Sequence, residues 1–451
     1  MSGVLGIYGK NLEKISQMMY YGLYALQHRG QVSTGIAINN NGFIDYYKDM
    51  GLVNEVYKSD DLKSLRGNIS IGQVRYAFSD EKIDKKNIEP LVVGYKNGAL
   101  AIAHDGHIAD YCRLKEELEE MGSIFQTDLD SEIIANLIAR TRKSDIVEGV
   151  QEVLKDIEGS YSLVIMTKDK LIGSRDSYGI KPLSLGKLEE EYVLSSETCA
   201  FDTLGAEFIR DIKPGETIVI DESGISSSFK EIETRSFCAF ESIYFARPDS
   251  QVDNESIYLS RISMGKELFK EAPVEADIVI GAPDSGIIAA IGFAESSKIP
   301  YAEGLIKNRY VGRTFISPTP ELREQGVRIK LNVLKENILG KRVILVDDSI
   351  VRGTTIKRTV EMLKAAGAAE VHVRIASPPV TNSCHLGMDT PDRENLIGAR
   401  LNIEAIKEEL GVESLHYLSL EGLLKSIGDR GFCTGCLTGD YPIGKDGMKC
   451  L

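Results

Sequence analysis

An apolar, strand-like run that ends at two adjacent carboxylates constrains the fold of this chain more than any other feature. The run covers residues 343–346, and Asp347 and Asp348 precede a turn of mostly small residues at 349–355. Backbone N–H groups and hydroxyls at the start of a helix bind phosphate, and paired carboxylates suit ribose hydroxyls or a phosphate-bound Mg²⁺. The segment therefore predicts a phosphate-binding turn between a strand and a helix. The alternative, an ordinary strand-to-helix connection, gives no reason for the paired acids.

Length and charge limit the class of protein. The chain has 451 residues, 43% of them hydrophobic, which suffices for two or three domains with buried cores. It has no apolar run of about 18 residues and no basic leader with a cleavage site, so we expect a cytoplasmic protein without a membrane span. The formal net charge of −14 argues against a nucleic-acid partner, because a phosphate backbone requires a basic surface.

The apolar pattern changes character near residues 231–236. Before this point it predicts a layered α+β domain, over residues 1–233. After it, strand and helix patterns alternate, which predicts a parallel α/β domain over residues 234–451. The strand-like segments are 98–103, 160–166, 277–280, 342–346 and 370–375, and the helix-like segments are 11–26, 130–140, one after Gly286, and 354–366.

Two more features of the second half suit a phosphorylated substrate. Residues 282–286 have the form of a second phosphate-binding turn, between a predicted strand and a predicted helix. A basic segment follows in this acidic chain, and as a lid it would stabilise the charge of a leaving group and exclude water. A solvated charged loop is the alternative. The basic residues are Lys307, Arg309, Arg313, Arg323, Arg328 and Lys330.

Segments 240–250, 308–315 and 347–354 together resemble glutamine phosphoribosylpyrophosphate (PRPP) amidotransferases, and the similarity runs nearly end to end. Segment 347–355 looks like the PRPP loop of type I phosphoribosyltransferases. The family displaces pyrophosphate from PRPP with ammonia, which its N-terminal domain releases from glutamine, and so begins purine synthesis. The resemblance implies an α+β N-terminal-nucleophile hydrolase-like domain, followed by an α/β type I phosphoribosyltransferase domain. It also implies a homo-oligomer, a tetramer in this family.

The resemblance assigns roles to residues of the phosphoribosyltransferase half. The expected PRPP-binding residues are Asp284, Ser285, Asp347, Asp348, Ser349, Val351, Arg352, Gly353, Thr354 and Thr355. The expected ligands of Mg²⁺ are Ser285, Asp347 and Asp348. The expected catalytic residues of the lid are Lys307, Tyr310 and Arg313.

The N-terminal half also resembles the family, but its nucleophile differs. In these domains the α-amino group of the first residue is the base for its own side chain, a cysteine. Here the matching residue, exposed by removal of Met1, is Ser2, whose hydroxyl is far less ionisable than a thiol with a pKa of about 8.5. Serine serves in other N-terminal-nucleophile enzymes, so this change alone is not decisive. Gln73 stands where the family commonly has a histidine. The similar segments are 27–31, 74–76, 175–183 and 196–200.

A second difference affects the oxyanion hole. At 104–107 the chain reads His-Asp-Gly-His where the family has His-Asn-Gly-Asn, and the family's first Asn and the Gly N–H stabilise the oxyanion. Asp105 puts an acceptor beside Gly106 where a donor is needed, and loss of one such donor costs roughly 10²–10³ in rate. Arg75 and Asp130, expected to bind the carboxylate and amino groups of glutamine, are present. We therefore predict a pocket that partly survives and a glutaminase step that is lost.

Four of the seven cysteines match the branch of the family that binds a [4Fe–4S] cluster. Cys433 and Cys436 form a CxxC pair, which alone suits a redox pair or free thiols equally well. Cys238 and Cys384 match the remaining two ligand positions, so the resemblance implies a structural cluster. The cysteines without a ligand role, expected to stay reduced in a cytosolic protein, are Cys112, Cys199 and Cys450.

Three functions stay open on the sequence alone. The first is an enzyme that makes phosphoribosylamine from PRPP and ammonia, which the complete transferase motifs favour. The second is an ordinary glutamine-dependent amidotransferase that uses Ser2. The third is a catalytically silent paralogue that binds PRPP or purine nucleotides and regulates a partner. A short salvage phosphoribosyltransferase would not account for residues 1–235.

Overall fold

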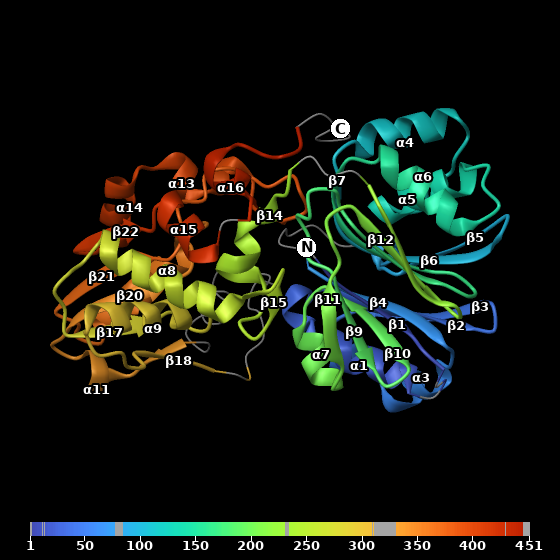
Figure 1. The fold of residues 1–451 in the computed structure, drawn as a ribbon. Coiled ribbons are helices and arrows are strands. Elements are labelled where there is room, and N and C mark those ends of the chain that lie inside the picture. The colour runs from blue at the N-terminus through green and yellow to red at the C-terminus, as the bar shows by residue number, and fades with distance from the viewer. Residues whose placement is uncertain are drawn as a thin grey trace.

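Two domains lie side by side in the computed structural model, the N-terminal one coloured blue to green and the C-terminal one yellow to red (Figure 1). The structure describes residues 2–10, 12, 14–76, 84–230, 234–308, 310, 331–428 and 430–444. None of the helices in these residues combines the length and the apolar character that crossing a membrane requires.

The N-terminal domain is built on two antiparallel sheets packed face to face. One sheet has the order β11 (Glu207–Asp211), β9 (Ser184–Leu188), β10 (Glu191–Ser195), β1 (Ser2–Tyr8), β4 (Ile69–Arg75), β2 (Ser33–Asn40) and β3 (Phe43–Met50). The other has the order β13 (Gly224–Phe229), β12 (Glu216–Asp221), β8 (Leu171–Arg175), β7 (Gly159–Met166), β6 (Gly98–Ile108) and β5 (Leu91–Tyr95).

Helices cover the outer faces of both sheets and make a four-layered domain. In β1, Val4 belongs to the core between the sheets and Leu5 to the core beneath helix α1 (Ile15–Ala25), because successive side chains of a strand point to opposite faces. Helices α1 and α7 (Cys199–Leu204) cover one sheet, and α5 (Asp130–Arg140) packs on β6 of the other. The remaining helices of this domain are α2 (Val53–Val56), α3 (Ser59–Ser64), α4 (Tyr111–Glu120), α6 (Ile146–Asp156), η1 (Gln27–Arg29) and η2 (Lys85–Asn87).

The C-terminal domain has a parallel sheet between helices, in the order β17 (Ile278–Gly281), β20 (Arg342–Asp347), β21 (Glu370–Ile375) and β22 (Ser414–Tyr417). In β20, Ile344 packs in the cluster that includes helices α8 (Ile257–Glu271) and α9 (Gly286–Ser297). Leu345 packs on the opposite face, in the cluster that includes α12 (Thr354–Ala365) and α14 (Ile403–Leu410). Both faces are therefore buried, as expected for a parallel sheet.

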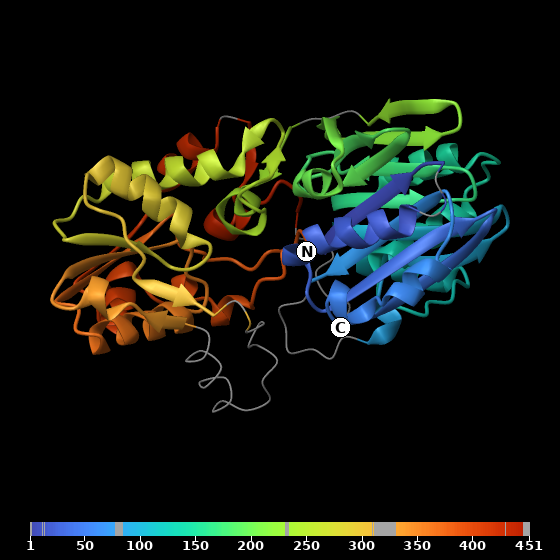
Figure 2. The same cartoon turned by 90° about the horizontal axis from the view of Figure 1, so that it is seen from below.

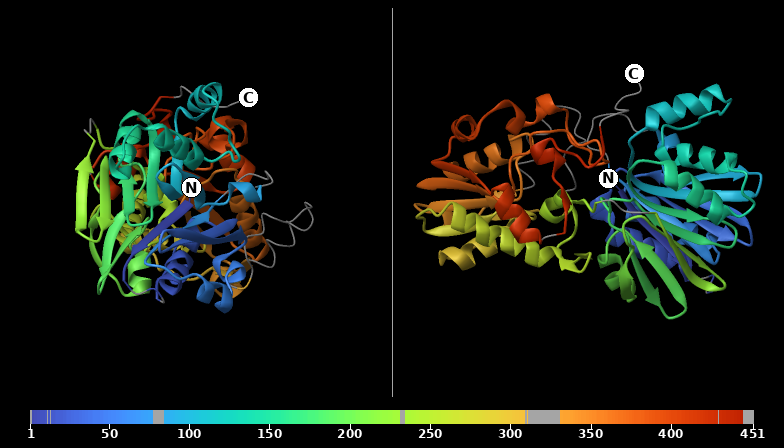
Figure 3. Two further views of the ribbon diagram at one scale, coloured as in Figure 1. Left: turned by 90° about the vertical axis from the view of Figure 1, so that its right-hand side faces the viewer. Right: turned by 45° about the horizontal axis from the view of Figure 1, so that its top comes forward.

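Shorter elements complete this domain and close it against the N-terminal one. Strand β14 (Phe237–Cys238) pairs in parallel with β23 (Phe432–Cys433), so the end of the described chain returns to the domain junction. Figures 2 and 3 show that β1 begins at this junction. The other elements among the described residues are η3 (Glu241–Phe245), β15 (Gln251–Val252), β16 (Glu255–Ser256), β18 (Leu305–Lys307), β19 (Leu331–Val333), α11 (Lys335–Ile338), η5 (Arg393–Asn395), α13 (Ile397–Arg400), α15 (Leu420–Ile427) and α16 (Gly435–Thr438).

The predicted fold class, a layered α+β domain followed by a parallel α/β domain, is confirmed. The helix expected at 130–140 has these bounds, and the one expected at 354–366 ends one residue earlier. The proposed boundary at 233/234 stays a prediction, since 231–233 lie outside the described residues. One expectation is wrong: Cys112 is disulfide-bonded rather than a free thiol.

Candidate active sites of the two domains

The predicted phosphate-binding turn joins β20 to α12 at the carboxyl edge of the parallel sheet. Gly353, just before the helix, has a φ of 83°, which a residue with a side chain rarely adopts. The N–H of Asp348 donates to Asp347 Oδ1 over 2.9 Å, and Ser349 Oγ donates to Asp348 Oδ1 over 2.5 Å. Local hydrogen bonds thus fix the two carboxylates just ahead of the turn. The N–H groups of the first turn of α12 are the groups that suit a phosphate.

The second turn, at 282–285, lies directly against the first. The N–H of Ala282 donates to Val346 O over 2.9 Å. A Cβ on Gly286 would lie 2.5 Å from Val346 O and 2.9 Å from Asp347 Cα, so only glycine permits this approach. Ser285 also hydrogen-bonds the Asp348 side chain. The structure therefore brings both predicted turns together at one edge of the sheet.

The surroundings of Asp347 and Asp348 disfavour the ionised form of both carboxyl groups. Burial and the neighbouring charge of Asp348 raise the pKa of Asp347 well above its usual range. Burial also raises the pKa of Asp348, although hydrogen bonds from Ser285 and Ser349 oppose the shift. Two such carboxylates favour a bound cation, because the cation offsets both the lost hydration and the mutual repulsion.

The expected lid residues are placed only in part. Lys307, at the end of β18, makes an ion pair with Asp284 of the second turn. The side chain of Tyr310 is exposed, at 99%. Arg313 lies outside the described residues. The structure therefore places Lys307 next to the proposed pyrophosphate site and leaves the roles of the other two as predictions.

In the N-terminal domain, a cavity of about 230 Å³ opens beside Ser2. Five residues named from the sequence meet there: Ser2, Gln73, Arg75, Gly106 and Asp130. Because β1 pairs with β4, Ser2 lies directly opposite Arg75. The other residues that line the cavity are Tyr76, Glu89, His104, His107, Tyr111, Asp128 and Leu129.

Asp105 lies beneath the start of the chain and is not among the residues that line the cavity. Its Oδ1 accepts a hydrogen bond from the N–H of Ser2 over 2.7 Å. Arg29 Nη2 lies 3.3 Å from Oδ2, and Lys181 Nζ lies 3.9 Å from Oδ1. Burial alone would raise the pKa of Asp105, but the charges of Lys181 and Arg29 lower it, so the carboxylate is ionised. The sequence predicted this side chain at the oxyanion position; the structure turns it to the backbone nitrogen of Ser2.

Arg29 connects this site to the C-terminal domain. It is fully buried, and its two terminal nitrogens contact the Glu241 carboxylate over 2.7 and 3.0 Å. It also contacts Glu197 over 2.6 Å and donates to Ser2 O over 2.9 Å. In the sequence, Arg29 and Glu241 stand out only as members of segments that resemble the family. Their contact could not be predicted, because no local pattern relates residues 212 positions apart.

Glu89 is a further residue of the cavity that the sequence did not single out. Gln73 donates from Nε2 to His104 O over 2.5 Å and also to the Glu89 carboxylate. Burial raises the pKa of Glu89 to about 7, against the opposing effects of Ser131, Arg75 and Gln73. Gln73 thus holds a buried acid in place at the wall of the cavity.

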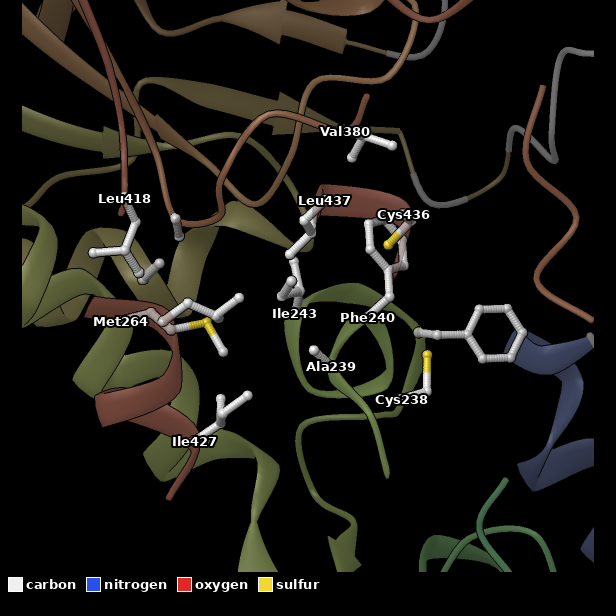
Figure 4. Packing of buried hydrophobic residues seen from close by; sticks show 14 of the residues in the cluster. Cys238, Ala239, Phe240, Ile243, Met264, Val380, Leu418, Ile427, Cys436 and Leu437 are labelled. Atoms are coloured by element: carbon white, nitrogen blue, oxygen red, sulfur yellow. The ribbon is translucent and has the colours of Figure 1, made fainter. Parts of the chain in front are cut away.

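The four cysteines predicted as ligands gather at the domain junction. Cys238 and Cys433 face each other in the β14–β23 pair. Burial and, to a lesser extent, neighbouring thiols of the group raise the pKa values of Cys238, Cys433 and Cys436. Burial raises the pKa of Cys433 to about 12 and raises that of Cys436 well above its usual range. Figure 4 shows Cys238 and Cys436 at the side of the apolar cluster that faces the N-terminal domain. Within the described ranges, no three His, Cys, Asp or Glu side chains form a compact site for a metal ion.

Fold and sites together define a phosphoribosyltransferase joined to an amidotransferase-type domain. Residues 77–203 match the glutamine amidotransferase domain family, and residues 252–377 match the phosphoribosyl transferase domain family. The chain is 48% identical to an amidophosphoribosyltransferase of Archaeoglobus fulgidus over 457 aligned positions, with all of both chains covered. It is 50% identical to an amidophosphoribosyltransferase of Synechocystis over 450, which covers 98% of this chain and 90% of the relative.

A solved structure gives the same result. The glutamine PRPP amidotransferase of Bacillus subtilis, in complex with ADP and GMP, superposes with a TM-score of 0.92 at 45% identity, covering 98% of each chain. The chain belongs to the amidophosphoribosyltransferase family, enzymes of purine biosynthesis that transfer a pentosyl group.

Proposed function

We propose that this protein displaces pyrophosphate from PRPP with ammonia to give 5-phosphoribosylamine, and that it no longer hydrolyses glutamine. The observation that carries the first part is the contact between two phosphate-type turns, with Asp347 and Asp348 at their meeting point. Lys307 beside Asp284 supplies a positive charge for the leaving pyrophosphate. The sheet edge binds and orients the substrate, and ammonia attacks the anomeric carbon as the pyrophosphate leaves.

The donors at this edge fit Mg²⁺. Ser285, Asp347 and Asp348 would hold it through oxygen atoms, which are the ligands that Mg²⁺ prefers. Burial raises the pKa of both carboxyl groups, and among the described residues only the Asp348 carboxyl group has a nearby positive charge, that of Arg261, which lowers its pKa. When bound, Mg²⁺ would offset the negative charge of the pyrophosphate group.

Two features support loss of the glutaminase step. Ser2 offers a hydroxyl where the family uses a thiol. Once Met1 is removed, the Ser2 nitrogen becomes an α-amino group 2.7 Å from the ionised Asp105 carboxylate. A carboxylate at this distance stabilises the ammonium form and raises the pKa of the amine. An amine that is protonated cannot serve as the base for the Ser2 hydroxyl.

A donor assay tests this function directly. Purified protein is incubated with PRPP and Mg²⁺, with either glutamine or an ammonium salt, and pyrophosphate release is followed. We expect release with ammonium and none above background with glutamine. Equal rates with glutamine would favour an ordinary amidotransferase that uses Ser2. Absence of release at high ammonium and alkaline pH would favour a silent, regulatory protein.

We further propose that the four gathered thiols bind a [4Fe–4S] cluster. Cys238, Cys384, Cys433 and Cys436 are the donors, and four cysteine thiolates are the usual ligand set. The thiols of such a cluster each bind a different iron atom, so they stand farther apart than the ligands of a single ion. The cluster would add covalent links between the domain junction and the chain end, which the β14–β23 pair already brings together.

Iron content provides the test of this proposal. Protein prepared without oxygen should be brown and contain about four iron atoms per chain. Cys436→Ser should lower iron content and thermal stability, whereas Cys199→Ser, a change to a free buried cysteine outside the group, should retain the iron. A colourless, folded, iron-free protein from the same preparation would contradict the proposal.

A further inference from the structure

One ion pair occupies the wall of the cavity beside Ser2. His107 Nδ1 lies 3.1 Å from Asp130 Oδ2, and His104 Nδ1 lies 3.8 Å from the same oxygen. The backbone N–H of Ile108 also hydrogen-bonds Asp130. The Asp130 carboxylate, with its side chain only 11% exposed, is therefore already satisfied by groups of its own chain.

The electrostatics of the pair favour its charged form. Burial opposes it, but the hydrogen bond and the charge of Asp130 raise the pKa of His107. Burial likewise opposes ionisation of Asp130, yet the bond from His107 lowers the pKa of that carboxyl group. The other groups that face His107 are His104, Lys181 and Tyr111, whose ring stacks 6.4 Å away. None of these is a negative charge that would compete with Asp130 for the imidazolium.

Three buried polar atoms of the cavity nevertheless lack a hydrogen-bond partner among the described residues. They are Glu89 Oε1, His104 Nε2 and the Tyr111 hydroxyl. All three residues line the cavity together with the guanidinium-bearing Arg75. Buried polar atoms are costly unless they are paired, so these atoms indicate a binding site for a ligand that carries polar groups.

We propose that His107 determines the specificity of this pocket by occupying Asp130 in place of a ligand ammonium group. The pocket then prefers a small carboxylate that has a carboxamide or second carboxyl end but lacks the α-ammonium group of an amino acid. Arg75 meets the carboxylate, and the unpartnered atoms meet the other end. An α-ammonium would instead approach an imidazolium, at a carboxylate that is already neutralised.

This inference goes beyond the proposed transferase function. It concerns ligand binding in the N-terminal domain alone, so it can be wrong while the transferase function is right. Calorimetry on the full-length protein at about pH 7 would compare glutamine with 4-carbamoylbutanoate, which is glutamine without its amino group. We expect 4-carbamoylbutanoate to bind about tenfold more tightly than glutamine, because one charge-assisted hydrogen bond contributes about this factor to an affinity. His107→Asn frees Asp130 and should reverse the preference.

Two controls make the result specific. His416→Asn, a change in β22 of the other domain, should leave both affinities unaltered. Raising the pH from about 6 to about 8 shifts His107 toward its neutral form while glutamine keeps its ammonium group, so glutamine binding to the wild type should strengthen, and it should not do so in His107→Asn. Tighter binding of glutamine to the wild type, no change in preference with His107→Asn, or no binding of either compound to folded protein would overturn the proposal.

Discussion

Replacing Asp347 and Asp348 together by asparagine is expected to abolish ammonium-dependent pyrophosphate release, with a loss of at least about 10³-fold. The two carboxylates would hold Mg²⁺ with PRPP, and asparagine keeps their shape while it removes both negative charges. The measurement is the initial rate of pyrophosphate release at saturating ammonium and Mg²⁺.

The same variant should fold at least as well as the wild type when no ligand is present. Burial raises the pKa of both carboxyl groups, and the charge of Asp348 raises that of Asp347 as well, so removing their charges relieves an unfavourable interaction. A matched control is Asp277→Asn, at the opposite end of β17, where the carboxylate pairs with Arg342. It should keep the rate. An active double variant would mean that the carboxylates are not the metal ligands.

The phosphoribosyltransferase site could be predicted from the sequence because its parts are contiguous. A strand, two acids, a small-residue turn and a helix lie within residues 342–365, and the structure has them in that order. The contact between this turn and the one at 282–285 follows from the parallel pairing of β17 and β20. Parallel strands place their carboxyl ends at one edge, which is where such folds bind ligands.

The N-terminal site could be predicted only in outline, because its residues come from separate strands and loops. Resemblance supplied Ser2, Arg75 and Asp130, but Glu89 and His107 act through contacts that no local spacing reveals. Nor does the sequence indicate the direction in which the Asp105 side chain points. A carboxylate buried between Arg29 and Lys181 is held by charges from two distant segments, and their convergence depends on the packing of both sheets.

If the glutaminase step is lost as we propose, this arrangement predicts that two changes are needed to restore it. With Ser2→Cys alone, the new thiol lies beside an α-amino group that Asp105 keeps protonated. With Asp105→Asn alone, the amine is released from the carboxylate, but the nucleophile is still a weakly acidic hydroxyl.

We therefore expect Ser2→Cys and Asp105→Asn to recover little glutaminase activity singly, and the double variant to exceed the product of the two single effects. Groups that act as a unit in one transition state are non-additive in this way. The measurement is glutamate release from glutamine, with removal of Met1 verified by mass. Asp105→Asn also leaves the buried Lys181 without its carboxylate partner, so melting curves must show that each variant is folded. Glutaminase activity in the unmodified protein that Ser2→Ala abolishes would contradict the loss of this step, since the serine would then be a working nucleophile despite Asp105.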